Sequence, residues 1–166
     1  MQGIFHPLQT PSHIILMLGL TFLLGQQGHL KALFLTPFAI IAGFSLNHFA
    51  LLDWNTELIL LSLALICGLL LVLRLKLPAF ISFALLIFCS VILGLDSSPI
   101  IIPGLGFNSI YSWRLGAAIT LILGITVLSL PAYFLNHYWN GIILRVAGSW
   151  IATSAIFVLT LMLAGR

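Results

Sequence analysis

Charged residues are scarce in this sequence. Of its 166 residues, six are Lys or Arg and three are Asp or Glu, so that 5% of the chain is charged. Soluble globular domains carry about 25% charged residues, because their surfaces face water. The scarcity therefore excludes a soluble domain. The formal net charge of +3 is small and scattered along the chain, which argues against a basic surface for nucleic acid.

Cysteines and recognisable catalytic motifs are also scarce. Cys67 and Cys89 are the two cysteines, and both lie within apolar stretches, far from any CxxC spacing. We expect them to be buried small side chains rather than a disulfide. The sequence contains no nucleophile with its base, no phosphate-binding loop, no nucleotide fingerprint and no convincing Ser or Asp pair for an intramembrane hydrolase. It predicts a protein that is not an enzyme.

Hydrophobic residues, by contrast, make up 61% of the chain, and the mean hydropathy is +1.24. Successive apolar stretches approach the roughly 17–25 residues that a membrane-spanning helix needs. The sequence therefore predicts an all-α integral membrane bundle of six transmembrane helices, which forms a single domain over residues 1–166. The predicted spans are Pro11–Gly25, Ala32–Leu51, Glu57–Leu73, Pro78–Leu95, Trp113–Leu135 and Gly141–Ala164.

The first span is unusually short. Thr10 and Pro11 have the pattern of an N-cap followed by proline at the first helical position. From there to Gly25 a helix is only about 22 Å long, less than the roughly 30 Å hydrocarbon core. We expect the preceding segment Ile4–Leu8 to enter the membrane as non-helical backbone, buried in protein or lining a polar cavity. The longest connection, Asp96–Ser112, contains two prolines and two glycines and is predicted to be an irregular surface loop.

The distribution of charge predicts an orientation. The first, third and fifth connections carry four basic residues: Lys31, Arg74, Lys76 and Arg145. The second and fourth connections are flanked by the three acidic residues: Asp53, Glu57 and Asp96. Basic connections are characteristic of the cytoplasmic side. Both chain termini are therefore predicted on the outer side of the membrane, together with the carboxylates.

Two histidines, His6 and His13, lie at the entrance of the first span. Ring nitrogens at membrane depth are costly unless they are paired or functional, and imidazole suits nickel, cobalt, copper and zinc. We predict a metal site formed by both rings and the carboxylate of Glu57. His48, near the outer end of the second span, is a candidate fourth ligand.

Simpler roles for the same residues remain open. His13 can bond a backbone carbonyl while His6 stays in water, and His48 can be an ordinary interfacial residue. Glu57 at the start of a helix is stabilised by the helix dipole alone. Asp96 is expected to be a solvated turn residue beside Ser97. Haem held by histidines of different helices is a further alternative.

The segment from His6 to Met17, HPLQTPSHIILM, resembles the opening of the HupE/UreJ family. Members of this family are small bacterial inner-membrane proteins associated with nickel or cobalt uptake. Their first helix carries an HPxxxxDH pattern, with Met four residues and Gln thirteen residues after the second histidine, and His13 and Gln26 fit this spacing. Three other segments resemble the family's third helix, basic turn and closing helix: Glu57, Leu73–Pro78 and Arg145–Ala152. The resemblance implies six spans in a bacterial inner membrane, with both termini on its periplasmic side, and Ni²⁺ or Co²⁺ as the transported ion.

The departures from the family pattern fall on its metal ligands. Ser12 stands where the family has aspartate, LGLDSS at 93–98 replaces a histidine-rich stretch, and Gly124 stands where a histidine is expected. Two function hypotheses follow. The first is a Ni²⁺ or Co²⁺ permease or metal-handling protein with His6, His13, Glu57 and His48 as ligands. The second is a divergent relative that no longer transports metal and acts as an accessory subunit of a larger membrane protein complex.

Overall fold

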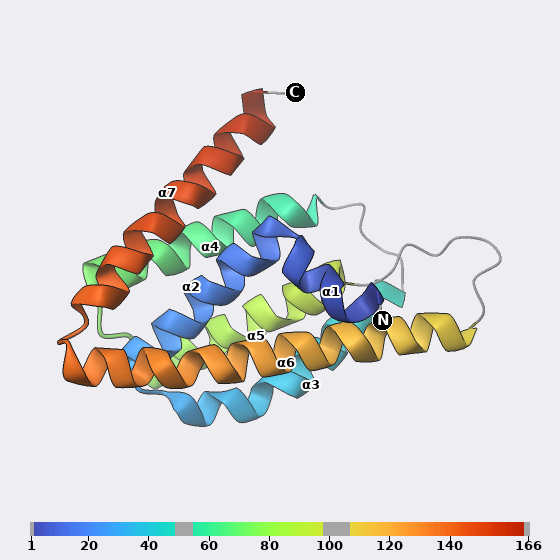
Figure 1. The fold of residues 1–166 in the computed structure, drawn as a ribbon, viewed down its shortest axis with the longest axis horizontal. Helices are drawn as coiled ribbons and strands as arrows, with labels where there is room; N and C mark the ends of the chain where they lie inside the picture. Colours follow the sequence, from blue (N-terminus) through green and yellow to red (C-terminus); the bar gives the residue numbers. More distant parts are fainter. Residues whose placement is uncertain (1, 49–54, 98–106, 165–166) are drawn as a thin grey trace.

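The computed structural model describes residues 2–48, 55–97 and 107–164, and these form helices joined by short connections (Figure 1). No strand occurs among them, which confirms the all-α prediction. The elements are α1 (Gln2–Gln9), α2 (Pro11–Gln27), the 3₁₀ helix η1 (Leu30–Leu35), α3 (Thr36–His48), α4 (Thr56–Leu73), α5 (Ala79–Asp96), α6 (Phe107–Tyr138) and α7 (Ile142–Ala164).

Four helices of the described chain are long and apolar enough to cross a membrane: α4, α5, α6 from Ile110 onward, and α7. Their mean hydropathies range from 1.9 to 2.6. An 18-residue helix is about 27 Å long, close to the roughly 30 Å hydrocarbon core. The protein is therefore a multi-pass membrane protein by the hydropathy of its helices. α2 has 17 residues, and Leu30–Leu46 forms a shorter apolar helix.

Most helix boundaries lie within two residues of the predicted ones, but α6 and α1 differ from expectation. α6 runs from Phe107 to Tyr138 rather than from Trp113 to Leu135, so the end of the predicted surface loop is helical. Ile4–Leu8 lies within α1 and is not the non-helical backbone that we expected. A helix bonds its own backbone groups and so avoids the cost of leaving them unpaired in an apolar environment. The predicted end of the second span at Leu51 lies outside the described residues.

The turn between α1 and α2 differs in detail from the expected cap. Thr10 is the N-cap and Pro11 opens α2, as predicted, but the Thr10 side chain makes no capping bond. Its hydroxyl instead donates to the carbonyl oxygen of His6, at 3.0 Å. The turn thereby ties the end of α1 to the start of α2.

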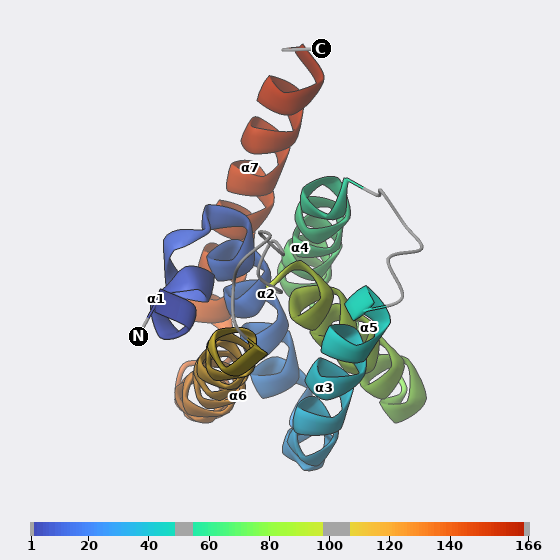
Figure 2. The same cartoon turned by 90° about the vertical axis from the view of Figure 1, so that its right-hand side faces the viewer.

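α2 runs through the middle of the bundle (Figure 2) and contacts α1, α4, α5, α6 and α7. The other extensive contacts join α4 to α7, α3 to α5, and α1 to α6. Small residues allow the close approaches, as is common between membrane helices. A Cβ atom at Gly68 of α4 would lie 2.8 Å from the backbone nitrogen of Ala152 in α7.

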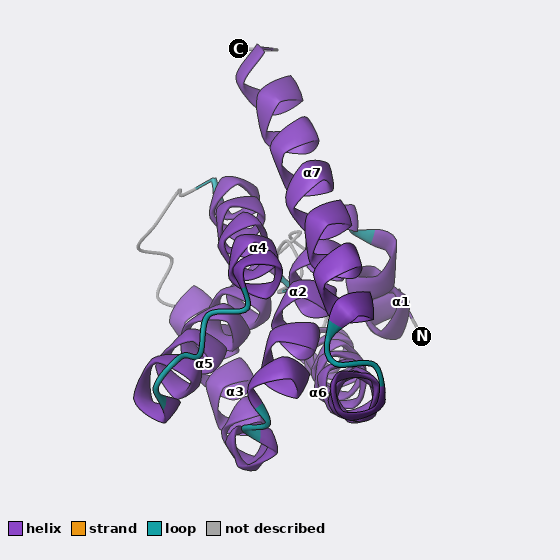
Figure 3. Ribbon diagram, turned by 90° about the vertical axis from the view of Figure 1, so that its left-hand side faces the viewer, coloured by secondary structure: helices purple, strands orange, loops and turns teal. Residues whose placement is uncertain are grey.

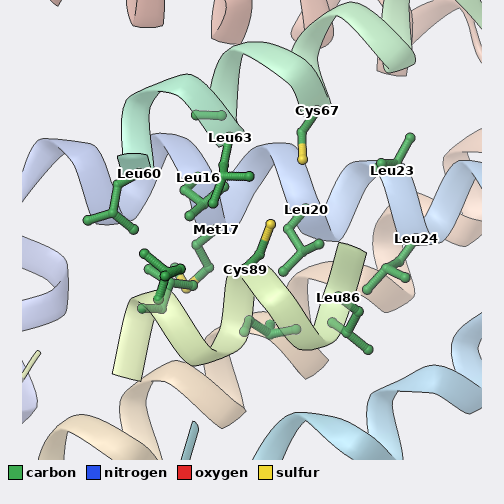
Figure 4. Packing of buried hydrophobic residues seen from close by; sticks show 14 of the residues in the cluster. Leu16, Met17, Leu20, Leu23, Leu24, Leu60, Leu63, Cys67, Leu86 and Cys89 are labelled. Atoms are coloured by element: carbon green, nitrogen blue, oxygen red, sulfur yellow. The ribbon is translucent and has the colours of Figure 1, made fainter. Parts of the chain in front are cut away.

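The centre of the bundle consists of packed hydrocarbon and sulfur side chains (Figure 4). Leu16, Leu20 and Leu60 are fully buried there. Cys67 and Cys89 are also fully buried, and both are free thiols. Their side chains point toward one another (Figure 4). The expectation of buried small side chains is therefore confirmed.

Candidate functional site

His13, near the start of α2, is paired with Asp96, the last residue of α5. The Nε2 atom of His13 lies 2.6 Å from the Oδ2 atom of Asp96, and the side chain of His13 is 1% exposed. An ionised carboxylate only accepts hydrogen bonds, so Nε2–H of His13 is the donor. The pair joins two helices that are far apart in the sequence.

Asp96 is also bound from a third helix. The hydroxyl of Thr56, at the start of α4, donates to Oδ1 of Asp96. Both carboxylate oxygens are therefore occupied, and 21% of the side chain is exposed. Our expectation that Asp96 would be a solvated turn residue was wrong, because α5 continues through it and residues at the starts of α2 and α4 supply donors.

His6 of α1 lies beside this pair. Its ring centroid is 5.8 Å from that of His13 and 5.5 Å from that of Trp113. The indole nitrogen of Trp113 donates to the carbonyl oxygen of Ser97, at 3.3 Å, which connects α6 to the end of α5. The two histidines that the sequence singled out are thus brought together, and Trp113 covers one of them.

Both imidazoles retain an unused nitrogen. The Nδ1 atoms of His6 and His13 are buried and have no hydrogen-bond partner in the described structure. Buried polar atoms are normally bonded, so each exception calls for an explanation. In a neutral ring whose Nε2 donates its proton to Asp96, Nδ1 keeps a lone pair.

Burial lowers the pKa of His6 below its usual value of 6.5. The neighbouring His13 lowers that pKa further, whereas the negative charge of Asp96 opposes the shift. The neutral form of His6 is therefore favoured. That is the form in which an imidazole coordinates a metal.

The structure does not place the other two predicted ligands, Glu57 and His48, in this cluster. Glu57 is exposed, and the carboxylate that contacts His13 belongs to Asp96, which corrects the expected pairing. Successive residues of a helix project about 100° apart, so Thr56 can reach the cluster while Glu57 points elsewhere. His48 ends α3, and its side chain lies outside the described part. Among the described residues, no three His, Cys, Asp or Glu side chains are grouped closely enough to hold a metal ion.

Two positions where the sequence departs from the HupE/UreJ pattern lie in the core. Ser12 is buried, and its hydroxyl has no partner in the described structure. A Cβ atom at Gly124 of α6 would lie 2.7 Å from the sulfur of Met17 in α2. Met17 thus fills the space where a side chain at position 124 would begin.

No protein-family model, curated protein or solved structure matches this chain. Its resemblance to the HupE/UreJ family therefore stays a prediction.

Proposed function

We propose that the protein binds a divalent transition-metal ion, Ni²⁺ or Co²⁺, at the His6–His13 cluster and carries it into the membrane as a permease or metal-handling protein. The observation that supports this most directly is the pair of buried, unpartnered Nδ1 atoms on His6 and His13. Imidazole nitrogens suit these metals.

The spacing of the rings is compatible with one ion between them. A metal–nitrogen bond of about 2.0–2.1 Å places the ion about 3 Å from each ring centroid, so two rings that share an ion have centroids up to about 6 Å apart. The centroids of His6 and His13 are 5.8 Å apart. Water or a further side chain would complete the coordination.

Asp96 acts on the metal through His13 in this proposal. A histidine that binds metal through one nitrogen commonly donates the other N–H to a carboxylate, which fixes the ring and raises its basicity. Nε2 of His13 makes such a bond to Asp96, and the hydroxyl of Thr56 holds the carboxylate in turn. Asp96 is thus a positioning residue.

The proposal includes six spans and an orientation. α2 and the segment formed by η1 and α3 are the two shorter spans, in addition to the four long apolar helices. Arg74 and Lys76, between α4 and α5, then lie on the cytoplasmic side. The His6–His13 cluster lies at the opposite, periplasmic end, where it meets ions arriving from outside.

Metal accumulation in cells tests the proposal. Cells expressing wild type should accumulate Ni²⁺ or Co²⁺, and His13→Ala should return accumulation to the background of cells without the protein. Asp96→Asn should weaken metal affinity about 10–100-fold, as other substitutions of supporting partners do. Glu57→Gln is the matched control, because it removes an exposed carboxylate next to Thr56 and should change nothing. Equal accumulation by wild type and His13→Ala, at equal protein levels, would end the permease proposal.

An accessory subunit of a larger membrane protein complex is a second candidate, which the shape of α7 favours. The C-terminal half of this helix projects beyond the bundle (Figures 1 and 3). Phe157, Leu161 and Leu163 are exposed along it, which leaves an apolar surface for lipid or another chain. This candidate predicts that the 18.1 kDa chain migrates in a larger hetero-complex on native gels after extraction in mild detergent. Migration as the chain alone would contradict it.

A further inference from the structure

A cavity of about 470 Å³ lies at the other end of α2 and α4, away from the His6–His13 cluster. It is lined by Gln26, Gln27, Arg74, Leu75, Lys76 and Asn136. These residues come from the last turn of α2, the connection between α4 and α5, and the last turns of α6. We call it the Arg74–Lys76 cavity.

Three side-chain amides hold the wall of this cavity in place. Nε2 of Gln26 donates to the carbonyl oxygen of Leu71, at 3.2 Å, and Nε2 of Gln27 donates to that of Leu75, at 2.6 Å. Nδ2 of Asn136 donates to the backbone oxygen of Gln26, at 3.0 Å. Because these bonds join three separate segments of the chain, the cavity is built by the fold and not by one loose loop.

Its rim carries positive charge that no described carboxylate neutralises. Arg74 and Lys76 are both exposed, and a guanidinium nitrogen of Arg74 donates to the side-chain oxygen of Asn140, at 3.2 Å. The two described acidic residues, Glu57 and Asp96, lie near the start of α4 and at the end of α5. They are thus separated from the rim by about 27 Å of helix. The rim therefore attracts anions and repels divalent cations.

The wall also contains acceptors without donors. Oε1 of Gln26 and Oδ1 of Asn136 are buried and have no hydrogen-bond partner in the described structure. Both amide nitrogens already donate to backbone oxygens, so the free acceptors do not result from reversed amide groups. A ligand that suits the cavity carries an anionic group for the rim and an N–H or O–H donor for these oxygens.

We propose that the Arg74–Lys76 cavity binds a phosphate ester. Its phosphate oxygens accept hydrogen bonds from Arg74 and Lys76, while an ammonium or hydroxyl group of the same molecule faces the amide oxygens of Gln26 and Asn136. Two sources share this chemistry: the headgroup of a phospholipid and a free phosphate ester. The cavity lies at the ends of apolar helices, and basic pockets between membrane helices at this depth bind lipid headgroups.

Binding to the full chain, purified in detergent, tests the proposal. The lipid probes are phosphatidylethanolamine, phosphatidylglycerol and phosphatidylcholine, and native mass spectrometry measures their binding. Inorganic phosphate and glycerol phosphate are then added as soluble competitors. The double variant Arg74→Gln/Lys76→Gln should bind phosphatidylglycerol about 30-fold more weakly, from the usual contribution of two cations at a membrane surface. Phosphatidylcholine should bind more weakly than phosphatidylethanolamine, because its quaternary ammonium has no N–H.

The control variant Lys31→Gln/Arg145→Gln removes two charges from the same end without changing a lining residue, and it should bind as wild type does. Lys76→Arg keeps the charge and should retain binding, which separates loss of charge from misfolding. Lipid binding that soluble phosphates do not displace assigns the site to a headgroup, and displacement by glycerol phosphate assigns it to a free ester. Equal loss in the double variant and the control, or no binding of any probe, would overturn the proposal.

Discussion

The two ends of the bundle are built from the same helices but carry opposite chemistry. At one end, the starts of α2 and α4 and the end of α5 bring His13, Thr56 and Asp96 together. At the other end, the end of α2 and the connection between α4 and α5 place Arg74 and Lys76 around a cavity. One end of the bundle thus carries the paired imidazole and carboxylate of His13 and Asp96, and the other carries the cations of Arg74 and Lys76.

The two ends are also stabilised differently. The His6–His13 cluster depends on bonds between side chains, and His13 is nearly fully buried. The Arg74–Lys76 cavity depends on amide side chains that bond to backbone oxygens, and its cations stay exposed. A buried side-chain pair is sensitive to the loss of either partner, whereas an exposed cation contributes little to folding. The first end therefore determines stability more than the second does.

Between the ends lies the packed core of the bundle. Leu16, Leu20 and Leu60 of α2 and α4 are fully buried in it (Figure 4). A charged ion in such surroundings is strongly disfavoured. Under the proposed function, an ion bound at the His6–His13 cluster would therefore cross to the other side only if these helices moved apart.

The largest expected effect tests this contrast in stability. Asp96→Ala leaves the buried N–H of His13 and the hydroxyl of Thr56 without their acceptor, and it should lower the free energy of unfolding by about 1–3 kcal/mol. Glu57→Ala removes an exposed carboxylate one residue from Thr56, and the change should stay within about 0.5 kcal/mol. Unfolding in mixed micelles measures both. Equal losses of unfolding free energy in the two variants would mean that the pairing of Asp96 with His13 stabilises the fold no more than an exposed carboxylate does.

Much of the fold could be predicted from the sequence, because long apolar stretches and their polar interruptions follow simple rules. Thr56–Leu73 differs from the expected span by one residue at its start, and Ala79–Asp96 differs from its expected span by one residue at each end. The early start of α6 at Phe107 was missed, because prolines and glycines just before it favour a loop. The helical α1 was missed because Pro7 lies inside it, and proline usually interrupts a helix.

The candidate site could be predicted only in part. The proximity of His6 and His13 followed from their spacing around a turn, whereas their acidic neighbour required knowing which helix ends meet. Placing Asp96 in the loop made it look like a solvated residue. It was, however, one of three acidic residues in the chain and followed directly on an apolar span, and an acidic residue at membrane depth usually marks a function.

A smaller effect separates backbone conformation from charge at the Arg74–Lys76 cavity. Arg74 ends α4 with φ of 50°, in the left-handed region. Glycine adopts this conformation without the steric cost of a Cβ atom, so Arg74→Gly should be about 1 kcal/mol more stable than Arg74→Ala. Both variants lose the same charge and should weaken phosphate ester binding equally. Unequal binding, measured by native mass spectrometry, would mean that backbone stability and not charge governs the cavity.

The smallest effect concerns the pH dependence of the other end. Burial, with a contribution from His13 and against the opposing charge of Asp96, lowers the pKa of His6 in the folded protein. The unfolded chain keeps a value of about 6.5 and so binds the proton first as the pH falls. Above pH 6.5 His6 is neutral in both states and does not lower the free energy of unfolding. As the pH falls below 6.5 the unfolded chain gains the proton first, so the free energy of unfolding falls. The full loss is reached below the pKa of His6 in the folded protein.

His6→Phe removes this titration while keeping an aromatic ring against Trp113. Between pH 8 and pH 5, wild type should therefore lose more unfolding free energy than His6→Phe loses. The difference should be small, because His6 is only partly buried. Unfolding of both proteins across this range measures it. Parallel pH profiles would show that His6 is as well solvated in the folded protein as in the unfolded chain. Burial would then not keep His6 neutral, and so would not favour the form that binds metal.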